Sequence, residues 1–170
     1  MLKKIQPKNL YYLLVGILIA MVSVVAEAST NAVGEWKLKE VWNENEAGLL
    51  PITGDGDSYV LKLLPQDDND TVSNQLRLSV KVSNVMGSSV EILEEDENSH
   101  QQTIKIGFVM SSRMFPGSEE KRQLENYLST QLPKMVSMEV KGSEEQDKLL
   151  VLSTEAGAKI VCEPAEDMQD

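Results

Sequence analysis

Residues 104–133 read IKIGFVMSSRMFPGSEEKRQLENYLSTQLP, and this stretch decides the fold. It begins with apolar residues that alternate with a lysine and a glycine, the pattern of a half-buried strand. The predicted inner face of this strand consists of Ile104, Ile106 and Phe108. A polar elbow then leads away from the strand and contains Pro116 and Gly117, which interrupt regular structure.

The second half of the stretch predicts an amphipathic helix. Its apolar stripe recurs at helical spacing and consists of Leu124, Tyr127, Leu128 and Leu132. Ser118 is a suitable N-cap, and the two glutamates after it suit the positive end of the helix dipole. Pro133 ends the helix. The rest of the chain after the leader alternates with period two, so we expect an α+β fold in which a curved antiparallel sheet packs around a single helix.

Short strands are expected in eight segments. The clearest is 75–82, in which four apolar residues alternate with Arg77, Ser79 and Lys81. The complete set is 34–42, 58–64, 75–82, 88–93, 104–108, 135–141, 148–153 and 158–162. In the first strand, Trp36, Leu38 and Trp42 are expected to face the same side.

The first 28 residues have the features of a signal peptide. Three lysines precede the uncharged segment 10–26, and Ala26-Glu27-Ala28 has the small-x-small pattern of a cleavage site. The alternative is an uncleaved signal anchor, since this segment is near the lower length limit for a membrane span. In both cases the lysines stay on the cytosolic side. The domain then reaches the secretory pathway, the cell exterior or a periplasm-like compartment, and stays membrane-anchored there if the leader is retained.

The segment after the leader divides into one domain, residues 29–163, and an acidic tail, residues 164–170. Loss of the leader removes three lysines and one glutamate, which changes the net charge from −11 to −13. Such a charge repels nucleic acid and anionic lipid. We therefore expect no nucleic-acid partner, and membrane contact only through residues 1–28 if they are uncleaved.

Acidic clusters at 67–70, 94–97 and the tail lack the ligand spacing of an EF-hand loop. We interpret them as solvated loops and expect no metal site. Asn69, in Asn-Asp-Thr, is the one N-glycosylation sequon.

No set of catalytic or cofactor-binding residues stands out. Cys162 is the only cysteine and shares a predicted strand face with Ile160, so a buried, inert thiol is expected. His100, the only histidine, lies in an acid-flanked loop, and one Cys and one His are too few for a zinc site. A Cys–His nucleophile pair and a carboxylate pair for glycoside hydrolysis stay open as alternatives. G-x-S-x-G, H-E-x-x-H and phosphate-binding glycine loops are absent, so we expect a protein that is not an enzyme and needs no cofactor.

The elbow has the most unusual local sequence, with Ser112 followed by Arg113, Met114 and Phe115. An arginine next to Met and Phe is typical of the centre of a protein interface. The alternative, favoured by local sequence alone, is that Met114 and Phe115 close the end of the sheet while Arg113 pairs with an acid.

The same elbow resembles the signature of the META domain (HslJ-like) family, in the form V-M-S-S-R-M-F-P-G-S-E-E-x-x-x-L-E-N-x-L. Residues 34–38 resemble the family's opening G-x-W-x-L strand. Residues 78–87 resemble its central strand and Asn/Gly turn, as seen in parasitic flagellates. The closing LLVLSTEAGAKIVCE resembles its last hairpin. The resemblance implies a half-barrel around one helix, no known catalysis, and a link to secretory traffic, stress resistance or virulence.

Two functional hypotheses follow. The first is an exported module that binds a protein partner in the secretory or extracellular compartment through the elbow. The second is a lipocalin-like carrier of a small apolar ligand in the concave face of the sheet, since lipocalins also open with G-x-W-x-L. In that case Trp36 and Trp42 are the candidate ligand-facing residues.

Overall fold

Eight antiparallel strands close into a barrel. The computed structural model describes residues 32–44, 49–50, 59–66, 74–96, 100–112, 117–144 and 147–165. The strands of the barrel are β1 (Gly34–Trp42), β3 (Val60–Pro65), β4 (Gln75–Lys81), β5 (Val85–Asp96), β6 (Gln101–Ile106), β8 (Met135–Lys141), β9 (Leu149–Thr154) and β10 (Lys159–Pro164). Their spatial order is β10-β9-β8-β6-β5-β4-β3-β1, and β1 pairs with β10 again to complete the circle.

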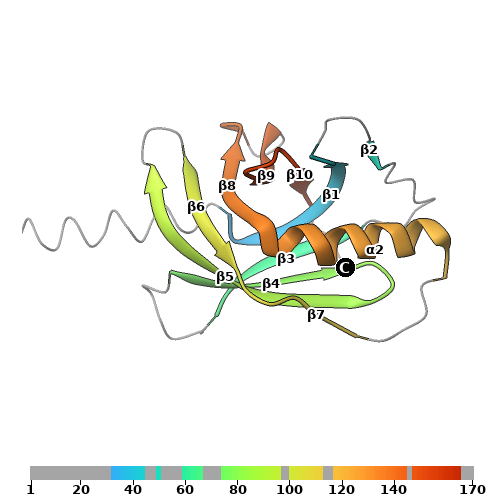
Figure 1. Ribbon diagram of the computed structural model, residues 1–170. Helices are drawn as coiled ribbons and strands as arrows, with labels where there is room; N and C mark the ends of the chain where they lie inside the picture. Colours follow the sequence, from blue (N-terminus) through green and yellow to red (C-terminus); the bar gives the residue numbers. More distant parts are fainter. Residues whose placement is uncertain are drawn as a thin grey trace, which may run out of the picture.

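Three short elements and one helix complete the described chain. β2 (Leu49–Leu50) pairs with the end of β1, and β7 (Met110–Ser111) pairs with the start of β5. Between β7 and β8 the chain forms helix α2 (Glu119–Gln131) and the 3₁₀ turn η1 (Leu132–Lys134). Figure 1 shows α2 lying across the strands at one end of the barrel, far from the end of β5 and the start of β6.

The predicted half-barrel is wrong, because the last strand closes the sheet. β10 pairs with β1 along its length, from Trp42↔Lys159 to Trp36↔Pro164. Beyond this pairing, the backbone N–H of Ala165 donates to the carbonyl oxygen of Glu35 at 3.0 Å. An open sheet leaves two edges with unpaired backbone groups, and closure removes both.

A β-bulge in β1 changes which side chains face inward. The pairing of β1 with β10 shifts register between Leu38 and Glu40. Trp36 and Leu38 are buried before the bulge, Val41 is buried after it, and Trp42 is only half-buried. The prediction that Trp36 and Trp42 share one face is therefore wrong, because the extra residue of a bulge reverses the alternation of the strand.

The barrel interior is filled by side chains from the strands, α2 and η1. Among the described residues, twelve large side chains have almost no exposed surface: Leu61, Leu63, Leu76, Leu78, Met86, Leu128, Leu132, Met135, Met138, Leu150, Leu152 and Ile160. An eight-stranded barrel is just wide enough for side chains to fill it. The concave face on which the carrier hypothesis depended is thus the hydrophobic core.

Helix α2 and the turn η1 together contribute the predicted stripe to this core. Leu124, Tyr127 and Leu128 of α2 are buried, and so is Leu132, the first residue of η1. The Ser118 hydroxyl accepts a hydrogen bond from the backbone N–H of Lys121 at 3.3 Å, which confirms the predicted N-cap. Phe108 was predicted to lie on the inner face of a strand, and this prediction is wrong. Strand β6 ends at Ile106, and the Phe108 side chain is 86% exposed.

The acidic segment 94–97 was expected to be a loop, but residues 94–96 belong to β5. Glu94, Glu95 and Asp96 pair with residues 103, 102 and 101 of β6, after a register shift that follows Ile92. Pairing with β6 satisfies the backbone groups of this segment while the carboxylates stay at the surface or near it.

Several sequence predictions lie outside the described residues. These are the signal peptide or anchor, the sequon at Asn69, the elbow residues Arg113, Met114 and Phe115, and the tail beyond Ala165. Of the helices in the described part of the chain, none is long and apolar enough to cross a membrane.

Tyr127 fixes the helix to the seam where the barrel closes. Its hydroxyl lies 2.7 Å from the carbonyl oxygen of Trp42, the last residue of β1, and 3.1 Å from that of Lys159, the first residue of β10. Burial raises the pKa of Tyr127 to about 12 from its usual 10.0, and the Glu44 carboxylate adds to the shift. The folded state therefore favours the neutral phenol. This contribution to stability is complete below pH 10 and is lost as the pH rises towards 12.

We expect Tyr127→Phe to lower the free energy of unfolding by about 1–2 kcal/mol below pH 10, because the backbone carbonyls of Trp42 and Lys159 lose their hydroxyl partner. Between pH 10 and 12 the difference from the wild type should shrink. Urea unfolding of both proteins across this range measures it. A difference that does not change with pH would contradict the assignment.

Candidate functional site

The carboxylate of Glu125 joins helix α2 to the turn between β4 and β5. One oxygen accepts hydrogen bonds from the backbone N–H groups of Ser83 (2.8 Å) and Asn84 (2.6 Å). The other oxygen accepts from the side-chain amide of Asn84 at 2.8 Å. Both Glu125 and Asn84 are buried, so three donors in a poorly solvated place depend on one carboxylate.

Ser112 connects the elbow to the same turn. Its backbone N–H donates to the carbonyl oxygen of Val85 at 3.0 Å, and its hydroxyl accepts from the backbone N–H of Val85 at 3.0 Å. The hydroxyl also donates to the side-chain oxygen of Asn84 at 3.3 Å. The two described residues that border the elbow are therefore both fixed: Ser112 by these bonds, and Ser118 as the N-cap of the helix that Glu125 anchors.

Large apolar side chains are exposed beside this anchor. Phe108 is 86% exposed, Met110 is 67% exposed and Val85 is 50% exposed. Met110 lies opposite Gly87 on β5, two residues from Val85, and the carbonyl oxygen of Phe108 accepts a hydrogen bond from the Ser88 hydroxyl at 3.3 Å. We call Val85, Phe108, Met110 and Ser112 the elbow face.

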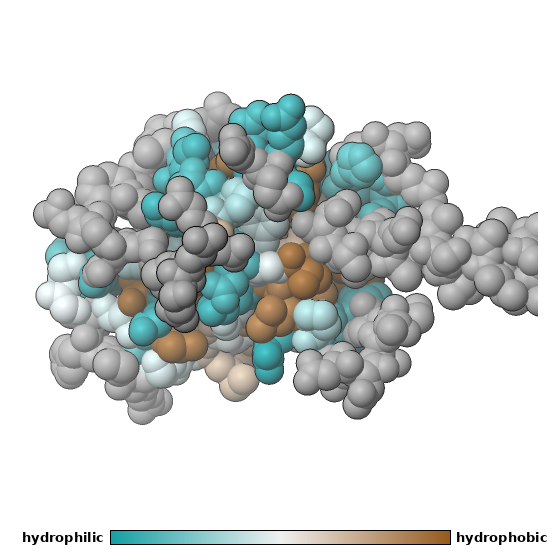
Figure 2. All heavy atoms as spheres, turned by 180° about the vertical axis from the view of Figure 1, so that it is seen from behind, coloured by the Kyte–Doolittle hydropathy of each residue, from teal (hydrophilic) through white to brown (hydrophobic). Residues whose placement is uncertain are grey.

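Basic residues border the elbow face. Lys81 of β4 lies directly opposite Val85, and Arg77 lies opposite Ser89 farther along the same pair of strands. Both side chains are exposed, and neither forms an ion pair with any residue that the structure describes. Figure 2 shows the side of the molecule turned away in Figure 1, where hydrophobic and hydrophilic residues are interspersed. The elbow face thus has an apolar centre and a basic edge, in a chain whose net charge is −11.

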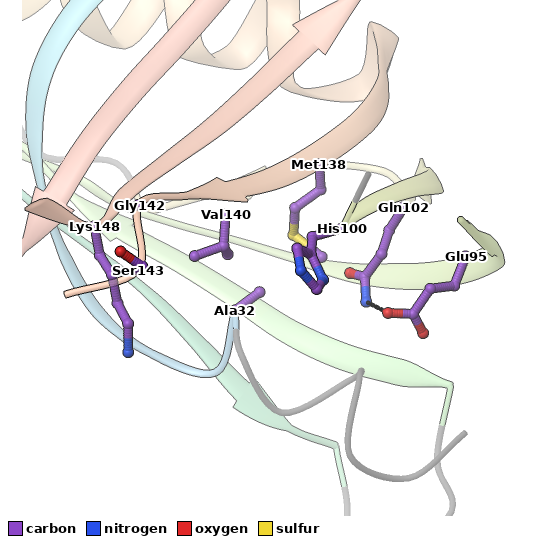
Figure 3. Close-up of a pocket in the computed structure, with 9 residues that line it drawn as sticks. All are labelled: Ala32, Glu95, His100, Gln102, Met138, Val140, Gly142, Ser143 and Lys148. Carbon is purple, nitrogen blue, oxygen red and sulfur yellow. Dashed lines mark hydrogen bonds between the residues drawn. The ribbon is translucent and has the colours of Figure 1, made fainter. Parts of the chain in front are cut away.

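The opposite end of the barrel is an open mouth with a cavity of about 280 Å³. Its apolar lining comes from Ala32, Met138 and Val140 (Figure 3). Its polar lining consists of Glu95, His100, Gln102, Ser143 and Lys148. The side-chain amide of Gln102 donates to the Glu95 carboxylate at 3.4 Å, which orients both groups at one side of the cavity.

The carrier hypothesis placed both tryptophans on one ligand-facing surface, but the structure places them in different surroundings. The indole N–H of buried Trp36 donates to the carbonyl oxygen of Ala32 at 2.9 Å, so Trp36 supports the chain beneath the mouth. The indole N–H of Trp42 donates to the Glu40 carboxylate at 3.0 Å near the other end of β1. Neither residue is among those that line the cavity.

Cys162 has no exposed surface, as the sequence predicted. Burial raises the pKa of its thiol to about 12, and the Glu163 carboxylate adds to the shift. Because the thiolate is the nucleophilic form, this thiol is inert near neutral pH. His100 is exposed at the mouth, whereas Cys162 is fully buried, so the structure gives the two side chains opposite surroundings. Among the described residues, no three His, Cys, Asp or Glu side chains form a group that could hold a metal ion.

Comparison with known proteins gives one likeness at the level of fold. A protein from Burkholderia xenovorans, whose structure was determined by NMR, is similar with a TM-score of 0.57 and 13% sequence identity. The match covers 83% of this chain and 88% of that chain. No protein-family model matches the chain, and no curated protein matches its sequence.

Sequence reasoning named Ser112 as a candidate partner-binding residue, and it did not anticipate Phe108 as an exposed residue or the lining of the mouth. Phe108 was assigned to an inner face, because nothing local shows that pairing stops at Ile106. One feature of the sequence could have indicated the mouth. Gln102 lies at the inward position that continues the alternation of Ile104 and Ile106, and it is buried as they are. A polar side chain at an inward position marks a place where the core ends or a polar site begins.

We expect Glu125→Gln to lower the free energy of unfolding by about 1–3 kcal/mol, since a glutamine amide group would face one of the three donors and leave it unsatisfied. The matched control is Glu155→Gln in the exposed β9–β10 turn, which should change stability by less than about 0.5 kcal/mol. Chemical denaturation measures both. Equal stability of the two variants would show that the Glu125 bonds contribute nothing.

Proposed function

We propose that this chain is an exported, META-like module that works by binding another protein, without catalysis, through the elbow face. The observation that carries the proposal is the exposure of Phe108 and Met110 directly before the anchored elbow. Large apolar residues of this kind are buried at the centres of protein interfaces, where they contribute most of the binding energy. A rigid support lowers the entropy lost on binding, and the Ser112 and Glu125 hydrogen bonds supply that support.

Membership in the META domain family is part of this proposal and rests on the order of the motif segments. A spatial arrangement supports this proposal. Asn84, Ser112 and Glu125 come from separate parts of those segments, and Asn84 forms hydrogen bonds with both Ser112 and Glu125. The motifs thus describe one physical unit, the anchored elbow. Export, with a link to secretory traffic, stress resistance or virulence, is proposed from the leader and from this family resemblance.

The charge of the elbow face favours one class of partner. Arg77 and Lys81 border the apolar centre, so an apolar side chain flanked by acidic residues complements both features. Exposed charge pairs contribute mainly to the rate of association and to specificity. We therefore propose a partner segment with one or two apolar anchors and adjacent Asp or Glu.

The test uses the full chain, tagged at its C-terminus and expressed in its source cells. The double variant Phe108→Ser and Met110→Ser should reduce recovery of the specific partner at least about tenfold, since each apolar anchor contributes on the order of 1–2 kcal/mol. Because both side chains are already exposed, unfolding free energy should change little.

Leu93→Ser is the matched control, because Leu93 is also exposed (52%) but lies towards the mouth end of β5. Recovery with this variant should equal that of the wild type. Raising the salt concentration should weaken capture by the wild type, as expected for a basic edge that meets acidic residues. Equal capture by the double variant and the Leu93→Ser control would refute the proposal.

A further inference from the structure

We propose that Met110 is a site of reversible oxidation, and that its conversion to the sulfoxide by hydrogen peroxide weakens binding of the partner at the elbow face. This inference rests on the proposed function, because Met110 is one of the exposed apolar residues of that face. It adds a regulatory modification to a surface that is otherwise proposed only to bind.

Exposure singles out Met110 among the methionines that the structure describes. Met110 is 67% exposed, whereas Met86, Met135 and Met138 are each 1% exposed. Hydrogen peroxide must reach the thioether sulfur, and a buried methionine becomes accessible only when the fold opens locally. Oxidation at Met110 should therefore be much faster than at the three core methionines.

The local structure keeps the Met110 side chain open. β7 is two residues long and, within the described chain, pairs only with β5 (Figure 1). The residue opposite Met110 is Gly87, which has no side chain to cover the thioether. The backbone N–H of Ser112 donates to the carbonyl oxygen of Val85 at 3.0 Å, so the chain beside Met110 is fixed. Met110 is thus presented at the surface by backbone that is held in the sheet.

The oxidation adds one oxygen atom to the thioether of Met110. The sulfur attacks one oxygen of hydrogen peroxide, and an S–O bond forms while the O–O bond breaks. The departing hydroxide takes the proton of the transferred hydroxyl group and leaves as water, so that sulfur loses two electrons and the peroxide gains them. Methionine sulfoxide reductases reverse the step with two thiols, which become a disulfide as the oxygen leaves in water.

The thiol of Cys162, the one cysteine of the chain, does not compete for the oxidant. Cys162 has no exposed surface, and burial raises the pKa of its thiol to about 12. The thiolate is the form that reacts with peroxides. Brief oxidation therefore changes the elbow face and leaves the core intact.

Oxidation changes the property on which the proposed binding depends. A sulfoxide is polar and accepts hydrogen bonds, so burial against an apolar side chain of the partner costs desolvation that the thioether does not require. Phe108 and Val85 keep their apolar surface, so binding should weaken without vanishing. Loss of one apolar anchor should reduce recovery of the partner roughly tenfold.

Peptide mapping by mass spectrometry, after brief treatment of the native full chain with hydrogen peroxide, tests the site. Trypsin separates the methionines, because residues 106–113 contain only Met110, residues 82–105 contain Met86, and residues 135–141 contain Met135 and Met138. The first peptide should gain oxygen at least about tenfold faster than the other two. Equal rates in the three peptides would overturn the inference.

Capture from source cells tests the consequence, with the partner defined by its dependence on Phe108 and Met110. Peroxide treatment of the wild type should reduce recovery roughly tenfold, and the two stereospecific methionine sulfoxide reductases with dithiothreitol should restore it. Met110→Leu keeps an apolar side chain without sulfur, so it should capture as the untreated wild type does, before and after peroxide. Met110→Gln introduces a polar side chain and should capture as the oxidised wild type does.

The outcomes distinguish failure of this inference from failure of the proposed function. If the untreated double variant Phe108→Ser and Met110→Ser captures as the wild type does, the proposed function is wrong and this inference falls with it. If that variant loses capture but wild type with oxidised Met110 captures fully, only the regulation is wrong. Equal loss of capture by peroxide-treated wild type and Met110→Leu would also overturn the inference, because damage elsewhere would then be the cause.

Discussion

The hydrogen bonds to the buried carboxylate of Glu125 are the interactions on which the helix end of this barrel depends. The carboxylate accepts hydrogen bonds from Ser83 and twice from Asn84, and Asn84 in turn accepts from Ser112. Without it, three donors in a buried turn would lack partners, at a cost of about 1–3 kcal/mol for each unsatisfied group. One side chain thus sets the position of the helix, the β4–β5 turn and the start of the elbow together.

The closed barrel gives its two ends different surroundings. At the helix end, α2 covers the interior and Tyr127 bonds to the seam between β1 and β10. At the mouth, no helix of the described chain covers the interior. The sheet ends there in a cavity with a mixed polar and apolar lining. The helix end therefore presents exposed apolar side chains on a hydrogen-bonded support, whereas the mouth presents a small cavity.

Local patterns predicted local structure well and long-range geometry poorly. The helix cap at Ser118, the buried stripe of α2 and the inert Cys162 follow from spacing and side-chain chemistry within a few residues. Closure by β10 and the bulge that turns Trp42 outward depend on pairing between residues over 100 positions apart, which no local pattern encodes. The exposure of Phe108 was also missed, since β6 ends at Ile106 although β5 continues beside this segment and pairs with β7. Ser112 was named as a candidate because the elbow is unusual in sequence, whereas each residue that lines the mouth is ordinary in its local sequence.

Amide hydrogen exchange at Ser83 and Asn84 tests the central claim most directly. Both residues lie outside the strands, in a turn that would normally exchange within seconds to minutes. If Glu125 holds this turn as the structure shows, their amides should exchange as slowly as that of Val80 in the adjoining strand. Exchange at the rate of an exposed turn, such as that at Glu155, would mean that the Glu125 anchor does not hold the elbow in solution.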